Sequence, residues 1–156
     1  MSRNAYIALA SIGSVLLLAG AYAFQHLGGL APCQLCLWQR WPHVAAALIG
    51  LFALALGRWS HGRFMPWLGM LAALTSAGIA AYHTGVERDW WQGPTACSGG
   101  GIGGGSGADL LSLEGPLGVV MCDEVAWQMA GLSMASWNML ASLALAGLWA
   151  MAALRR

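Results

Sequence analysis

The four cysteines of this chain are the residues best suited to chemistry. Cys33 and Cys36 form a Cys-x-x-Cys pair, and Cys97 and Cys122 enclose a longer segment further along the chain. Four cysteines allow three pairings, and proximity in sequence favours Cys33 with Cys36 and Cys97 with Cys122. A Cys-x-x-Cys pair serves redox exchange, half of a zinc site or a structural bridge.

The surroundings of the first pair favour redox chemistry. A disulfide that closes so short a loop constrains the unfolded chain little, so a purely stabilising role is weak. The pair opens an apolar run that we expect to be helical, and thiolates at a helix N-terminus have lowered pKa values. Arg40 lies four residues after Cys36, on the same helical face. Its guanidinium can stabilise a thiolate or donate to an oxygen that gains charge.

Other readings of these residues remain open. Arg40 could extend to a membrane interface as an isolated charge. The Cys-x-x-Cys pair could bind zinc together with Cys97 and Cys122, although a second Cys-x-x-Cys is missing. The second pair could be a structural disulfide around the glycine-rich run 98–107. Alternatively, the flexibility of that run lets Cys97 reach a soluble partner, because thiol–disulfide exchange passes through a mixed disulfide.

The composition shows which kind of protein positions these cysteines. Hydrophobic residues make up 58% of the chain and charged residues 8%, with no lysine. Soluble proteins have roughly 45–50% and 25%. A net charge of +1 offers no basic surface for nucleic acid. The composition therefore excludes a soluble enzyme, a disordered chain and a nucleic-acid-binding protein, and it predicts an integral protein of the lipid bilayer.

Four apolar segments predict an all-α integral membrane protein. A spanning helix needs about 20 apolar residues. The sequence predicts spans over about 5–24, 41–57, 64–83 and 133–154, with the second starting near Leu35 if it is to be long enough. They form a four-transmembrane-helix bundle in a single membrane domain, 1–156. The two outside loops are then 25–40 and 84–132, and 108–120 is expected to form a short interfacial helix.

The charges predict the orientation of these spans. Five of the seven arginines lie at the two termini and in the turn near residue 60, and all six acids follow the third span. The positive-inside rule then places both termini in the cytoplasm and all four cysteines outside. Tryptophans near the span ends predict aromatic belts, with Trp59, Trp67 and Trp149 toward the cytoplasm. Cleavage of the first span as a signal peptide after Ala21-Tyr22-Ala23 would leave this orientation unchanged.

Two cysteine pairs on one side of a membrane suggest an electron relay. Electrons would pass from a soluble dithiol to Cys97–Cys122, then to Cys33–Cys36, and finally to an acceptor in the lipid. The chain has no sequence pattern for haem attachment, flavin binding or a metal cluster. A quinone dissolved in the bilayer is the natural two-electron acceptor.

The chain resembles the bacterial disulfide-bond formation protein B (DsbB) family. The motifs that carry the resemblance follow one another in order along the chain: Pro32-Cys33-Gln34-Leu35-Cys36, Gln39-Arg40, His83-Thr84, Cys122-Asp123-Glu124, Trp127, Gly131-Leu132-Ser133-Met134 and Trp137-Asn138. The glycine-rich run after Cys97 departs from the family's pattern. The resemblance implies a protein-disulfide:quinone oxidoreductase of the bacterial inner membrane.

The resemblance also implies partners and residue roles. The enzyme would reoxidise a periplasmic thioredoxin-fold dithiol oxidase of the DsbA type and use ubiquinone or menaquinone. Cys97 would form the mixed disulfide with this partner, and Cys122 would resolve it. Cys36 would act on the quinone, with Arg40 in contact with it and His83 nearby. No metal site is expected.

Three rival hypotheses remain. A non-catalytic membrane scaffold would use both cysteine pairs as structural disulfides. A membrane metal-binding protein would use the cysteines as ligands. A quinone reductase similar to vitamin K epoxide reductase would have a similar bundle, but its Cys-x-x-Cys pair lies late in the chain, whereas Cys33 is early here.

Overall fold

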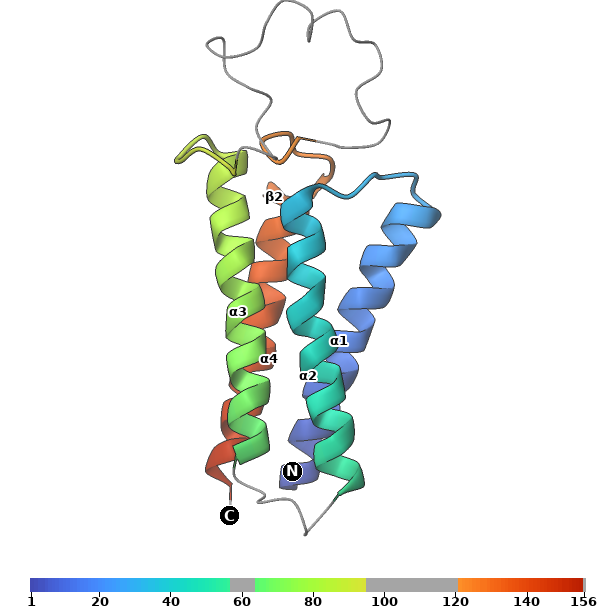
Figure 1. Ribbon diagram of the computed structural model, residues 1–156, viewed down its shortest axis with the longest axis vertical. Coiled ribbons are helices and arrows are strands. Elements are labelled where there is room, and N and C mark those ends of the chain that lie inside the picture. The colour runs from blue at the N-terminus through green and yellow to red at the C-terminus, as the bar shows by residue number, and fades with distance from the viewer. Residues whose placement is uncertain (57–63, 95–120, 156) are drawn as a thin grey trace, which may run out of the picture.

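The computed structural model describes residues 1–56, 64–94 and 121–155. It contains four long helices: α1 (Arg3–His26), α2 (Gln34–Ala55), α3 (Phe64–Glu87) and α4 (Met134–Leu154). Each helix packs against its two neighbours, with α1 closing the ring against α4. The helices run alternately up and down, so both termini lie at one end of the bundle (Figure 1). Arg155 connects the two terminal segments at that end, because its Nη1 donates a hydrogen bond to the Met1 carbonyl at 2.8 Å.

Three of these helices, α1, α3 and α4, are long and apolar enough to cross a membrane. Large apolar side chains lie on the outside of the bundle, for example Leu16 at 65% and Leu71 at 61% exposure. The interior instead contains many alanines and small polar residues. Small residues inside and large apolar residues outside are typical of helices that pack within lipid. The structure is thus that of an all-helical, multi-pass membrane protein.

Two helices, α2 and α3, extend beyond the expected apolar segments at the end of the bundle that carries the cysteine pair. α2 begins at Gln34, so the Cys-x-x-Cys pair lies in its first turn, as the apolar run from Leu35 suggested. α3 continues to Glu87, one turn beyond His83. That additional turn places a carboxylate next to the cysteines. The interfacial helix expected over 108–120 lies outside the described residues, as does Cys97.

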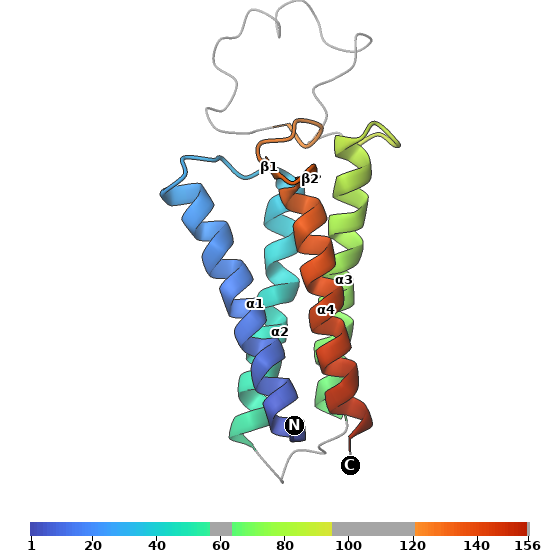
Figure 2. The same ribbon diagram turned by 180° about the vertical axis from the view of Figure 1, so that it is seen from behind.

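A short hairpin before α4 was not expected from the sequence. Its strands, β1 (Gln128–Met129) and β2 (Leu132–Ser133), pair antiparallel. Ala130 and Gly131 between them have positive φ, as the tightest hairpin turns require. Ser133 then caps α4, because its Oγ accepts from the Ser136 amide at 3.2 Å. Figure 2 shows this hairpin at the end of the bundle away from the termini.

The end with the termini has a core built around Trp149. This side chain is fully buried and packs with Ile7, Ala53 and Ala73. The expectation that Trp149 belongs to an aromatic belt at the membrane interface is therefore wrong. The indole ring occupies the space that a side chain at position 69 of α3 would need. Gly69, which has no side chain, leaves that space free.

Candidate functional site

The Cys-x-x-Cys pair lies at the N-terminus of α2, at the end of the bundle opposite the termini. Cys33 is the N-cap residue, and its Sγ accepts from the Cys36 amide at 3.2 Å. Both cysteines are free thiols, and the Cys33 thiol donates to Cys36 Sγ at 2.8 Å. Cys33 is buried, whereas Cys36 is partly exposed. Of the two, Cys36 is therefore the sulfur more accessible from outside the bundle.

The two sulfurs differ in acidity because one donates a hydrogen bond to the other. The hydrogen bond to Cys36, and then burial, raise the pKa of the Cys33 thiol above its ordinary value. The same hydrogen bond from Cys33 lowers the pKa of Cys36 against the opposing effect of burial, with smaller help from Arg40. The first turn of a helix also favours a thiolate. Cys36 is thus the better leaving group when a Cys33–Cys36 disulfide is attacked.

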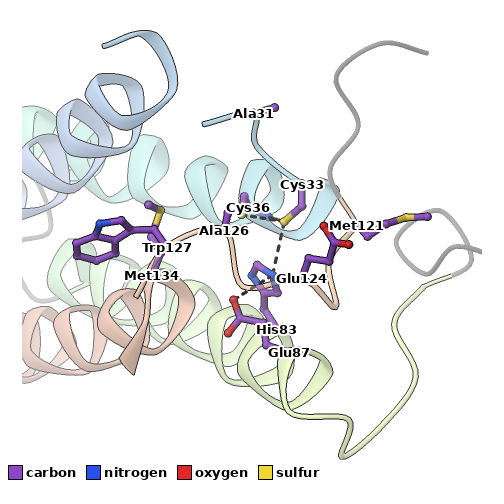
Figure 3. Close-up of a pocket in the computed structure, with 10 residues that line it drawn as sticks. All are labelled: Ala31, Cys33, Cys36, His83, Glu87, Met121, Glu124, Ala126, Trp127 and Met134. Atoms are coloured by element: carbon purple, nitrogen blue, oxygen red, sulfur yellow. Dashed lines mark hydrogen bonds and ion pairs between the residues drawn. The ribbon is translucent and has the colours of Figure 1, made fainter. Parts of the chain in front are cut away.

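His83 and Glu87 on α3 face this pair (Figure 3). His83 Nε2 lies 3.5 Å from Cys33 Sγ and 3.8 Å from Glu87 Oε1. The two side chains are only 4% and 6% exposed. Ser133 donates a short hydrogen bond to Glu87 Oε2 and so links this site to the start of α4. Sequence analysis missed Glu87, although it lies four residues after His83 and therefore on the same helical face.

Cys122 lies beside the first cysteine pair. It is fully buried and packs with Cys33, Leu35 and Val86. The Sγ atoms of Cys33 and Cys122 and a ring nitrogen of His83 all lie within 4.8 Å of one another. Cys122 itself is disulfide-bonded. The structure therefore brings together three of the expected site residues from three separate segments of the chain.

Arg40 turns toward α1. Its Nη1 donates to Gln25 Oε1 at 2.7 Å, and its guanidinium lies 4.8 Å from the centre of the Tyr22 ring. The Nε atom is buried and has no hydrogen-bond partner among the described residues. His83 instead contacts Cys33 and, through Nδ1, the Gln39 amide at 3.0 Å. Arg40 and His83 thus both lie near the cysteine pair but bond to different helices.

A small pocket of about 30 Å³ opens beside the two thiols. Apolar side chains of Trp127 and Met134 form one wall, and Trp127 in turn packs on Phe24 of α1 at 5.1 Å between ring centres. The full lining consists of Ala31, Cys33, Cys36, His83, Glu87, Met121, Glu124, Ala126, Trp127 and Met134 (Figure 3). The pocket therefore combines an apolar wall with thiols, an imidazole and two carboxylates.

A second group of polar residues was missed by the sequence analysis. Gln39, His43, Ser76 and Asn138 form hydrogen bonds with one another inside the bundle, below the cysteines. Gln39 and His43 are four residues apart in α2. That spacing puts both on one face of a helix and could have pointed to them. Gln39 and Asn138 also stand in the motifs of the family resemblance, where they were given no role.

Comparisons with known proteins show which family the chain resembles. The family model described as "Disulfide bond formation protein DsbB" matches residues 3–152. The chain is 33% identical to disulfide bond formation protein B of Dechloromonas aromatica over 88% of this chain and 84% of that protein. It is 35% identical to the protein of the same name from Verminephrobacter eiseniae, over 96% and 85%. No solved structure gives a significant match. This chain therefore belongs to the DsbB family of membrane proteins for disulfide bond formation.

Proposed function

We propose that the chain is a membrane thiol–disulfide oxidoreductase that passes electrons from a soluble dithiol partner to a membrane quinone. The observation that carries the proposal is the proximity of Cys33 and Cys122, whose sulfurs lie within 4.8 Å. Two cysteine pairs so close together can exchange a disulfide. The partner would be a periplasmic protein of the thioredoxin fold, such as DsbA, and the membrane would be the bacterial inner membrane.

The exchange between the pairs proceeds in two balanced steps. Once the partner has reduced Cys97–Cys122, the Cys122 thiolate attacks Cys33 Sγ, which forms a Cys33–Cys122 bond and releases Cys36 as a thiolate. The lowered pKa of Cys36 favours its release. The Cys97 thiolate then attacks Cys122, re-forms Cys97–Cys122 and releases Cys33. Two electrons have thus moved to the Cys33–Cys36 pair.

The residues around Cys36 fit a quinone. Cys36 is partly exposed, and Trp127 and Met134 supply an apolar wall beside it. The buried Nε–H of Arg40, unpartnered among the described residues, is a donor available for a carbonyl oxygen. A bound ubiquinone or menaquinone supplies the acceptor for two electrons and two protons. Arg40, Cys36 and the apolar wall would hold it, with His83 nearby.

Four membrane spans complete the proposed arrangement. α2 packs against both α1 and α3. Its polar residues, Gln39 and His43, are buried against the neighbouring helices and are not exposed to lipid. We therefore infer that α2 crosses the membrane with the others, with both termini in the cytoplasm and the cysteines in the periplasm.

Trapping of the partner tests the proposal. The Cys122→Ser variant should accumulate a covalent adduct with the oxidised form of the soluble partner, because the Cys97 thiolate attacks the partner's disulfide and no Cys122 thiol is present to displace it from the mixed disulfide. Non-reducing gels should show this adduct, and the Cys97→Ser/Cys122→Ser double variant should abolish it. A reduced thioredoxin-fold partner should also reduce quinone through the wild-type protein. Absence of both the adduct and the quinone reduction would refute the proposal.

The cluster of Cys33, His83 and Cys122 also supports a second candidate, a metal-binding protein. Their ligand atoms lie close enough together to surround one ion. Zinc requires cysteine as a thiolate, however, and Cys122 is disulfide-bonded. Stoichiometric zinc in purified, reduced protein, lost on alkylation, would favour this candidate over the redox proposal.

A further inference from the structure

A line of polar side chains is buried inside the bundle below the cysteines. Gln39 is 6% exposed, His43 is 3% exposed, and Ser76 is fully buried. Polar and ionisable groups within membrane helices are costly and usually serve a function. The proposed redox steps take place around Cys33 at the end of the bundle, and they leave His43 without a role.

Hydrogen bonds connect His43 to the reactive cysteine through three other side chains. His43 Nε2 lies 3.1 Å from Asn138 Oδ1, and Asn138 Nδ2 donates to Gln39 Oε1 at 2.6 Å. Gln39 Nε2 lies 3.0 Å from His83 Nδ1, and His83 Nε2 lies 3.5 Å from Cys33 Sγ. We call His43, Asn138, Gln39 and His83 the polar chain. It draws residues from α2, α3 and α4.

Ser76 determines which way the hydrogen bonds of the polar chain point. Its hydroxyl donates to the Gln39 backbone carbonyl, which lies 3.3 Å away. The Ser76 oxygen therefore accepts the hydrogen bond that it forms with His43 Nε2, at 3.0 Å. His43 therefore carries its hydrogen on Nε2, and Asn138 Oδ1 accepts from it as well. His43 Nδ1 is then the nitrogen without a hydrogen, and it has no partner among the described residues.

The same direction continues to Cys33. With its oxygen turned to His43, Asn138 presents its N–H to Gln39, and Gln39 presents its own N–H to His83 Nδ1. A neutral imidazole has a single N–H, so that of His83 is on Nε2. Cys33 Sγ and Glu87 Oε1, the latter at 3.8 Å, lie near this nitrogen and accept hydrogen bonds. The Cys122 backbone also forms a hydrogen bond with the His83 ring. Side-chain amides do not readily exchange protons, so the polar chain orients His83 and does not conduct protons.

We propose that His43 is a positioning residue that, through Asn138 and Gln39, holds His83 with its Nε2–H directed at Cys33 Sγ. The role of this N–H rests on the proposed function. When the Cys33–Cys122 bond breaks and Cys97–Cys122 forms, the electron pair stays on Cys33 Sγ. A donor beside that sulfur stabilises the departing thiolate.

The test measures the acidity of Cys33 in full-length protein that carries Cys36→Ala, with the second cysteine pair oxidised. Cys33 is then the one free thiol, and the ultraviolet absorbance of its thiolate can be followed against pH. His43→Leu should move the midpoint upward by about one pH unit, which is about tenfold less thiolate near neutral pH. His43→Gln should restore the original midpoint of the Cys33 titration, because the amide nitrogen of the introduced glutamine can take the place of His43 Nε2. Glu87, Glu124 and Arg40 also lie around the pair and are present in every variant.

Two comparisons separate positioning from a general loosening of the bundle. Ser14→Ala removes another fully buried polar group, one that bonds only within α1, and it should leave the midpoint unchanged. Nitrogen NMR of the wild-type protein should show the Nε2–H form of both His43 and His83. The inference fails if His43→Leu and Ser14→Ala behave alike, if His43→Gln behaves as His43→Leu does, or if His83 carries its hydrogen on Nδ1.

These outcomes are distinct from failure of the proposed function. The titration and the NMR spectrum require neither partner nor quinone. An unchanged midpoint in His43→Leu, together with adduct formation by Cys122→Ser, would overturn only the inference on His43. A shifted midpoint without adduct or quinone reduction would overturn the redox proposal and leave the polar chain in place.

Discussion

Arg40 is the charged residue of α2, and its position decides what it can bind. Its guanidinium is held between Gln25 and Tyr22 of α1, with Nε turned into the protein. Snorkelling alone would take the whole guanidinium to water. The contacts with α1 instead fix its position one turn from Cys36. This arrangement supports a role in binding an acceptor, beyond balancing the charge of a thiolate.

Arg40→Ala is therefore expected to weaken use of quinone. Loss of one charge-assisted hydrogen bond costs about 1.5–3 kcal/mol, so the apparent KM for quinone should rise at least about tenfold. Steady-state quinone reduction measures this change. Arg88→Ala is the matched control, because Arg88 lies over the Trp90 ring and does not line the pocket beside the thiols. An unchanged KM in Arg40→Ala would remove Arg40 from the site.

His83 and Glu87 illustrate how one helical turn defines a site. The i and i+4 positions of α3 place an imidazole 3.5 Å from Cys33 Sγ and a carboxylate 3.8 Å from that imidazole. Ser133, at the cap of α4, donates to the carboxylate. The surroundings of the reactive sulfur thus depend on how α2, α3 and the start of α4 are held together.

At the scale of the helices, close packing of α3 against α4 holds the bundle together. Trp149 of α4 occupies the space that a side chain at Gly69 of α3 would need, and a Cβ there would lie 2.5 Å from the indole ring. Ser11 on α1 and Gly50 on α2 make a similar close contact. Small residues at such contacts allow helices to approach in lipid, where the hydrophobic effect does not drive association.

Gly69→Ala should accordingly destabilise the protein. The added methyl group forces Trp149 to move, and such overpacking costs about 1–3 kcal/mol. Thermal unfolding in detergent should show a lower midpoint. Gly78→Ala on the same helix is the control, since nothing lies within 4 Å of its Cβ position. A Gly78→Ala variant as unstable as Gly69→Ala would contradict this account.

The whole molecule has two chemically distinct ends. The termini and Arg155 lie at one end, and Cys33, Cys36, Glu87 and Glu124 lie at the other. By the positive-inside rule, we expect the end with the termini to face the cytoplasm. The thiols of Cys33 and Cys36 would then face the oxidising side, where disulfides persist.

Labelling from outside the cell tests this orientation and the crossing of α2. Leu27 and Leu56 follow α1 and α2, at opposite ends of the bundle, and are 87% and 52% exposed. A membrane-impermeant thiol reagent should label Leu27→Cys in intact cells, whereas Leu56→Cys should react only after permeabilisation. Labelling is compared with that of wild-type protein to allow for the native cysteines. Reaction of both variants in intact cells would show that α2 does not cross.

Much of the architecture could be predicted from local patterns. Backbone groups in lipid must be satisfied within one helix, so long apolar runs indicate helices without knowledge of their neighbours. The start of α2 near Leu35 was predicted in this way. The family resemblance was predicted from short motifs around the cysteines. The hairpin of β1 and β2 was not, because its turn depends on Ala130 adopting a positive φ that alanine rarely takes.

The sequence alone determined the class of protein, and it predicted the cysteine pairs and the residues expected around them. Only the tertiary structure decided which side chains meet. The proximity of Cys33 and Cys122, the turn of Arg40 toward α1, the burial of Trp149 and the polar chain from His43 all depend on how the helices rotate and pack. Those contacts join residues far apart in the chain, and an apolar composition that varies little around each helix leaves its rotation open. Packing between large and small side chains, and hydrogen bonds inside the bundle, settle that rotation.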